Sequence, residues 1–300
     1  NMTFVFSILR KISRHLSMSR FAALLGVAAF AAGLCVLPMT AQADLTLTFG
    51  TYAADKPTDT VRKYRPFLNF LAERMSAELG ETVTIKMKIA KEYEAGINHL
   101  ASGEVDFARF GPASYVLAMK QNAGVQLVTM ESKKGSKRFK GVIVVHEDSD
   151  LQSVEQLTGR SFAFGDELST IGRYLAQSHL LEAGISSGEL QDFAYLGRHD
   201  LVGEAVGAGR FSAGALKEST YKKLVKKGVP IRVLMSFDNV TKPWLASSDV
   251  SAHVVDAMRR VMLASENEEI VRQISKNGFL AGTDADYDFV RQAMTQSELF

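Results

Sequence analysis

The sequence predicts an α/β protein built from two lobes, in each of which helices cover a sheet. Short apolar segments of strand length alternate with segments whose apolar residues recur every three or four positions, from residue 45 to about residue 236. This alternation is typical of sheets flanked by helices. The later segments are helical with no further strand, so they must pack on sheets that have already formed. The 257 residues from Asp44 onward are enough for two lobes of about 100–150 residues each.

The first lobe begins with a strand at residues 45–50, where apolar and polar residues alternate. A helix over residues 58–78 follows, with apolar residues on one face. The same strand-then-helix pattern predicts strands at 83–89, 105–110 and 125–130 and helices at 93–102 and 112–122.

The second lobe contains strands at 142–146, 161–164, 193–196, 212–215 and 231–236, with helices at 153–158, 170–183, 199–208 and 221–227 between them. Three more helices follow, at 251–264, 267–275 and 284–295. The simplest topology joins residues 44–138 and 236–300 in one lobe and inserts residues 139–235 as the other. Two crossovers, near Phe139 and Ile231, would then form a two-strand hinge.

Residues 1–43 have the pattern of a secretory signal peptide. Four basic residues precede an apolar run from Phe21 to Leu37, and Ala41-Gln42-Ala43 precedes Asp44. This predicts export with cleavage after Ala43, and an uncleaved membrane anchor is the alternative. The single cysteine, Cys35, lies in this segment, so the remainder must be stabilised by an apolar core without disulfides.

The charge of the chain argues against a nucleic-acid partner. The full chain has a net charge of +2, but the signal segment holds four of its 35 basic residues and none of its 33 acidic ones. The remainder is therefore close to neutral, at about −2. The lysine-rich runs at 133–140 and 222–227 are typical of solvated surfaces.

Three strand-to-helix turns, at residues 110–114, 168–172 and 196–200, are candidates for an anion site. The first N–H groups of a helix have no partner within it, and they face the positive end of the helix dipole. Ser169 or Thr170 would cap one helix, and capping alone is the competing interpretation. His199 opens the third helix and could donate to an oxyanion or lie in the core. Ser114 or its neighbour Tyr115 would face the site from the first helix.

Tyr52 and Tyr93 follow strands and, like Trp244, could either line a ligand site or serve packing alone. No catalytic signature accompanies these residues: the chain lacks a Gly-x-Ser-x-Gly elbow, a Walker loop and a cysteine nucleophile. No His/Cys cluster has metal-ligand spacing. We therefore expect no catalytic residue, metal or cofactor, and a protein that is not an enzyme.

The same segments resemble the periplasmic phosphonate and phosphite solute-binding proteins of ABC transporters. The resemblance covers about residues 45–235, and its motifs are Ala90-Lys-Glu-Tyr93, Gly103-Glu-Val-Asp-Phe-Ala108, Phe110-Gly-Pro-Ala-Ser-Tyr-Val-Leu-Ala118, Gly141-Val-Ile-Val-Val145, Leu157-Thr-Gly-Arg-Ser-Phe-Ala-Phe164 and Gly197-Arg-His199. It implies the type II periplasmic binding protein fold, in which each lobe is a mixed sheet flanked by helices. It also implies a periplasmic location and a membrane permease as partner.

In that family a Ser-Thr-Ser-Gly turn holds the phosphorus oxyanion, with a histidine after the next strand. The corresponding turn here is Ser169-Thr170-Ile171-Gly172, so Ile171 retains the N–H but lacks a hydroxyl. The resemblance thus implies a small anion such as phosphonate, phosphite or phosphate, held from the two lobes by Ser169, Thr170, the Ile171 N–H, His199, Ser114, Phe110, Tyr93 and Tyr52.

Two further positions concern an amino group on the ligand. Glu218 falls near an acidic position of aminoalkyl-phosphonate binders, whereas Lys242 stands where an aspartate is expected, which argues against an aminated ligand. Two alternative functions remain at this point. One is a ligand-sensing subunit for a sensor kinase, with an oxyanion such as arsenite or phosphite, and the other is an enzyme on the same fold.

Overall fold

The computed structural model describes residues 44–54 and 57–300. The predicted signal segment and its cleavage site after Ala43 lie outside the described residues. Residues 44–300 form one compact unit. None of the helices in the described part is long and apolar enough to cross a membrane.

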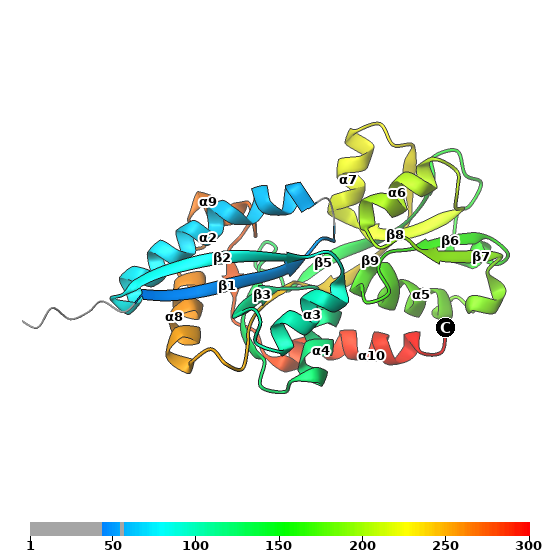
Figure 1. The fold of residues 1–300 in the computed structure, drawn as a ribbon. Helices are drawn as coiled ribbons and strands as arrows, with labels where there is room; N and C mark the ends of the chain where they lie inside the picture. The colour runs from blue at the N-terminus through cyan, green and yellow to red at the C-terminus, as the bar shows by residue number, and fades with distance from the viewer. Residues whose placement is uncertain (1–43, 55–56) are drawn as a thin grey trace, which may run out of the picture. The chain divides into compact units, whose positions relative to one another are not determined.

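Two separate sheets organise this unit (Figure 1). The first has six strands in the order β11 (Phe279–Leu280), β4 (Gln126–Glu131), β10 (Pro243–Ala246), β3 (Phe107–Arg109), β1 (Asp44–Tyr52) and β2 (Thr82–Ala90). Strands β1, β2 and β3 are parallel, and β10 runs antiparallel between β3 and β4. The sheet is therefore mixed.

Helices cover both faces of the first sheet because the side chains of its strands alternate between two cores. Leu47 and Phe49 of β1 pack on the side of α2 (Pro57–Leu79) and α8 (Ala252–Leu263). Tyr52 and Ala108 pack on the opposite side, with α3 (Tyr93–Ala101) and α4 (Pro112–Gln121). The short α9 (Glu269–Arg272) contacts α2. Trp244 of β10 is fully buried in the first core, so it serves packing.

The second sheet has five strands in the order β7 (Asp192–Tyr195), β6 (Ser161–Phe164), β8 (Ala213–Lys217), β5 (Arg138–His146) and β9 (Ile231–Val240). One face packs against a π-helical turn, η2 (Thr170–Leu175), which continues into α5 (Ala176–Glu182). The other face packs against α6 (His199–Gly207) and α7 (Glu218–Lys226). Short 3₁₀ turns complete the fold: η1 (Val154–Leu157), η3 (Ser187–Glu189) and η4 (Asp284–Tyr287).

The chain passes between the sheets twice, through residues 132–137 and through residues 241–242. The second passage lies beyond the expected boundary near residues 231–236. Strand β9 pairs with β5 as far as Val240 opposite Arg138. Because β9 is the edge strand of its sheet, polar residues such as Ser236 and Asp238 belong to the strand, although in sequence they indicate its end.

Two expectations for residues 236–300 are wrong. The segment contains two strands, β10 and β11. Pro243 can begin β10 because the first residue of a strand tolerates the missing N–H. The last helix, α10 (Asp288–Ser297), does not belong to the first sheet alone: it packs against η2 and α5 as well as α4. Hydrogen bonds from Ser178 to Gln296 (2.6 Å) and from Ser297 to Gln177 (2.7 Å) secure it against α5.

Candidate functional site

The turn between β6 and η2 is compact because two glycines meet in it. The Gly165 N–H donates to the Gly172 carbonyl at 2.8 Å, and a Cβ placed on Gly172 would lie 2.8 Å from the Gly165 Cα. The Ser169 hydroxyl accepts the Gly172 N–H at 2.9 Å, so Ser169 caps the turn. Capping uses one lone pair of this oxygen and leaves its O–H as a donor.

Thr170 joins this turn to the first sheet. Its Oγ1 accepts the Ala113 N–H at 2.9 Å, at the first turn of α4. The Thr170 side chain is buried. Its O–H group can rotate and donate to an acceptor beside it. A second hydrogen bond also joins a segment beside the second sheet to one beside the first. The His199 N–H, at the start of α6, donates to the carbonyl of Ala54, which follows β1, at 3.4 Å.

Three stacked aromatic rings lie beside the start of α4. The Tyr52 ring lies 3.8 Å from that of Tyr93 and 5.2 Å from that of Phe110, centroid to centroid. The Tyr52 hydroxyl accepts the Gly111 N–H at 2.7 Å and bonds with the Ser114 hydroxyl at 2.8 Å. Burial raises the pKa of Tyr52 to about 12, so the phenol stays protonated.

The three turns singled out in the sequence meet at one small cavity. It is lined by Tyr93, Gly111, Pro112, Phe139, Ser169, Thr170, Ile171, His199, Lys217 and Lys242. Its volume is about 10 Å³, close to the roughly 10–15 Å³ that one water molecule needs. The N-termini of α4, η2 and α6 therefore converge on a cavity that is almost closed in this conformation.

The predicted site residues fall into three groups around this cavity. Five of them line it, namely Tyr93, Ser169, Thr170, Ile171 and His199. Tyr52, Phe110 and Ser114 are buried directly behind its wall. Glu218 is not among its lining residues.

Glu218 instead pairs with two surface lysines, Lys222 at 3.0 Å and Lys133 at 3.6 Å. Partial burial raises its pKa, but the two ammonium groups outweigh this and lower the pKa overall. Glu218 is thus held as a carboxylate on the outside of α7.

Sequence reasoning missed Lys217 and Phe139. Lys217 is the last residue of β8 and precedes α7 directly, which is the same strand-to-helix arrangement as in the three turns. Its position at the carboxyl end of a strand is the signal that could have identified it.

The charged groups around the cavity are mostly cationic. Arg109 and Glu131 form a buried bidentate pair, with Nε–Oε1 at 2.7 Å and Nη2–Oε2 at 2.8 Å. Burial raises the pKa of Glu131, but Arg109 outweighs this and lowers it. Burial together with the charge of Arg109 lowers the pKa of Lys242 and brings that of Lys63 down to about 7.

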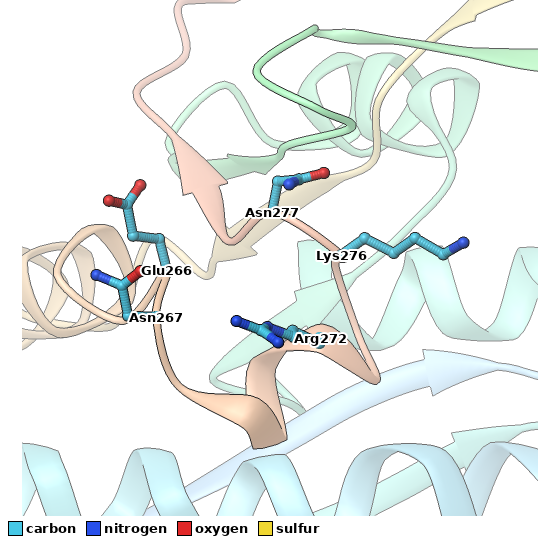
Figure 2. Close-up of a pocket in the computed structure, with 5 residues that line it drawn as sticks. All are labelled: Glu266, Asn267, Arg272, Lys276 and Asn277. Atoms are coloured by element: carbon cyan, nitrogen blue, oxygen red, sulfur yellow. The ribbon is translucent and has the colours of Figure 1, made fainter.

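A second, larger hollow lies on the surface beside α9, with a volume of about 520 Å³ (Figure 2). Glu266, Asn267, Arg272, Lys276 and Asn277 line it, and all five are exposed. Figure 2 shows that the Lys276 side chain points away from that of Arg272. The hollow contains none of the predicted site residues. Within residues 44–54 and 57–300, no three His, Cys, Asp or Glu side chains are placed to hold a metal.

Curated relatives of this chain are transport proteins. The phosphate-import protein PhnD of Mycolicibacterium smegmatis is 23% identical over 316 residues, covering 94% of this chain and 96% of that protein. The probable ABC transporter phosphite binding protein PhnD1 of Prochlorococcus marinus is 28% identical over 193 residues, covering 60% of this chain and 62% of that protein.

Solved structures share the fold. PhnD1 of Prochlorococcus marinus in complex with methylphosphonate has a TM-score of 0.74 at 21% identity, covering 85% of this chain and 99% of that one. A binding protein component of an ABC phosphonate transporter from Pseudomonas aeruginosa has a TM-score of 0.72 at 15% identity, covering 86% and 87%. The predicted type II periplasmic binding protein fold is therefore confirmed.

A family model for the periplasmic substrate-binding protein of phosphonate ABC transporters matches residues 49–287. This match covers well over half of the chain and includes every residue of the cavity. The family expected from the sequence motifs is thus confirmed, and the chain belongs to the periplasmic substrate-binding proteins of phosphonate ABC transporters.

Proposed function

We propose that this protein captures a small phosphorus oxyanion in the cavity between its two sheets and presents the closed form to a membrane permease. One observation carries the proposal: three helix N-termini, the hydroxyls of Tyr93, Ser169 and Thr170, and no carboxylate line the same cavity. Such a lining offers hydrogen-bond donors and positive potential to an anion.

Four lining residues act as hydrogen-bond donors in this account. The O–H groups of Ser169 and Thr170 donate to the oxyanion, because their acceptor sites already hold the N–H groups of Gly172 and Ala113. The Ile171 N–H belongs to the same turn and adds a backbone donor. His199 donates from the start of α6.

Binding requires the sheets to separate, because a cavity of about 10 Å³ cannot admit a phosphonate. We place the hinge at the passages through residues 132–137 and 241–242, and treat the two sheets with their helices as the two lobes. Opening would break the Ala113–Thr170 hydrogen bond, and the sheets would then close around the ligand. The closed state is then the form that a permease recognises.

The family and the relatives named above are described as transport components, so the comparisons do not support the alternatives of a sensor subunit or an enzyme. We further propose a periplasmic location, with export through residues 1–43 and cleavage after Ala43, no catalytic step, and no nucleic-acid partner.

A thermal-shift screen against phosphate, phosphite, methylphosphonate, 2-aminoethylphosphonate and sulfate tests this function. A ligand at 100 times its Kd stabilises the folded protein by about 2.7 kcal/mol, which is readily detected. We expect at least one phosphorus oxyanion to raise the Tm.

The combined variant Thr170→Val with His199→Ala should lose that response. Thr84→Val is a matched control, since Thr84 is exposed on β2, remote from the cavity lining. The proposal would be contradicted if no oxyanion raised the Tm, or if the double variant showed the same increase in Tm as the unsubstituted protein.

A further inference from the structure

The charged side chains that line the cavity are all cationic. Lys217 ends β8, and Lys242 lies in the passage between β9 and β10. Both side chains are partly buried. No aspartate or glutamate is among the lining residues. The cavity therefore presents two lysine side chains in addition to the hydroxyls, backbone N–H groups and imidazole that seat the oxyanion.

The nearest buried carboxylate, Glu131, is already engaged by groups other than Lys242. Glu131 accepts two hydrogen bonds from Arg109, at 2.7 and 2.8 Å, and a third from Trp244 Nε1 at 3.3 Å. Among residues 44–54 and 57–300, no carboxylate forms an ion pair with the Lys242 ammonium. Burying a charge without a partner is costly, and a ligand anion beside it removes part of that cost.

The electrostatic surroundings of Lys242 are consistent with this reasoning. Burial lowers its pKa, and the positive charges of Arg109, Lys217 and Lys63 lower it further. The charge of Glu131 raises the pKa but does not outweigh these effects. A negative group bound beside Lys242 would raise the pKa again and make the ammonium form favourable.

A group of neighbouring carboxylates lies outside the cavity lining. Glu92, Glu94 and Glu167 are exposed neighbours of Asp166. Burial raises the pKa of Asp166, the hydrogen bond from the Leu168 N–H opposes this, and the charges of the three glutamates add to the rise. None of these carboxylates lines the cavity.

We propose that the ligand carries a second acidic group besides its phosphorus oxyanion, and that Lys242, with Lys217, forms the subsite that receives it. This inference rests on the proposed function, because the oxyanion seat orients the ligand. The ligand class is then a phosphonate or phosphate ester bearing a carboxylate or a second phosphoryl group.

Calorimetric titrations at pH 7.5 with methylphosphonate, phosphonoacetate and 2-aminoethylphosphonate test the inference. We expect phosphonoacetate to bind at least tenfold more tightly than methylphosphonate, and 2-aminoethylphosphonate to bind most weakly. Lys242→Gln should weaken phosphonoacetate at least tenfold and change methylphosphonate less than threefold. Lys226→Gln, an exposed lysine on α7, is the control and should change neither.

A second readout separates a ligand contact from a merely structural role. Because the pKa of Lys242 is depressed, phosphonoacetate should bind with proton uptake at pH 8–9, measured by repeating the titration in buffers of different ionisation enthalpy. Lys242→Gln should reduce this uptake. Equal affinities for methylphosphonate and phosphonoacetate, or tightest binding of 2-aminoethylphosphonate, would overturn the inference alone. If no phosphonate binds, the proposed function fails and the inference fails with it.

Discussion

The contact between Gly165 and Gly172 allows a direct test of the geometry of the turn between β6 and η2. In Gly172→Ala, the new methyl group would lie 2.8 Å from the Gly165 Cα, 3.0 Å from the Gly165 nitrogen and 3.0 Å from the Ser169 Oγ. Two of these three atoms belong to the backbone and cannot rotate away. The β6 end and the η2 turn must therefore separate, which strains the 2.8 Å hydrogen bond between the two glycines.

Overpacking of this kind destabilises the folded state by about 1–3 kcal/mol. A Gly→Ala change also lowers the conformational entropy of the unfolded chain, which offsets less than about 1 kcal/mol of this loss. For a chain of this size we expect a loss of about 2–10 °C in Tm. Because Ser169 and Thr170 sit on the displaced turn, oxyanion affinity should fall at least tenfold.

The assay combines thermal and urea unfolding with a calorimetric titration of the oxyanion identified by the screen. Gly188→Ala is the matched control, since the nearest atom to its added methyl group is the Ser186 Oγ at 3.8 Å. That variant should keep its stability within about 0.5 kcal/mol and its affinity unchanged. A Gly172→Ala protein as stable and as tightly binding as the unsubstituted protein would refute the reasoning.

Two further predictions concern the charges beside the cavity. Glu131→Gln leaves the buried Arg109 without its counter-ion and should reduce the free energy of unfolding by about 3–5 kcal/mol, and a loss below 1 kcal/mol in urea unfolding would show that the pair is dispensable. The pKa of Lys63 is about 7 in the folded protein, below its unfolded value of about 10.4, so between these values the unfolded chain binds more protons and stability rises with pH. Lys63→Met should flatten this rise between pH 7 and 10 in urea titrations, whereas an unchanged slope would mean that Lys63 titrates normally.

Periodicity and turn composition were sufficient to predict most of the fold. The strand-to-helix turns at Gly111, Ser169 and His199 were identified because each combines a short strand with a capping or helix-starting residue. Their convergence follows from topology, since the carboxyl ends of strands in the two sheets face each other across the passages between them. The sequence pattern therefore predicts the three turns that line the cavity.

The parts that sequence did not reveal depend on long-range pairing. Strand β10 lies in the middle of the first sheet, yet Pro243 and the preceding Thr241-Lys242 are typical of a turn. The packing of α10 against α5 depends on side chains more than 100 residues apart, such as Ser178 and Gln296. No local pattern encodes such contacts.

Sequence alone also does not show which of two neighbouring side chains lines the cavity and which faces the surface. Glu218 stands one residue after Lys217, but the start of α7 directs Glu218 to the surface lysines while Lys217 lines the cavity. Single-residue differences in direction at a helix start depend on the exact boundary, which sequence patterns do not fix.

A crystal structure of the protein with methylphosphonate would test the central claim most directly. The account predicts sheets closed around the ligand, with phosphonyl oxygens within about 3.2 Å of the Ser169 and Thr170 hydroxyls and the Ile171 N–H. It would be contradicted by a phosphonate bound instead at the surface hollow beside Arg272 and Lys276, with the Ser169–Thr170 turn making no contact to it.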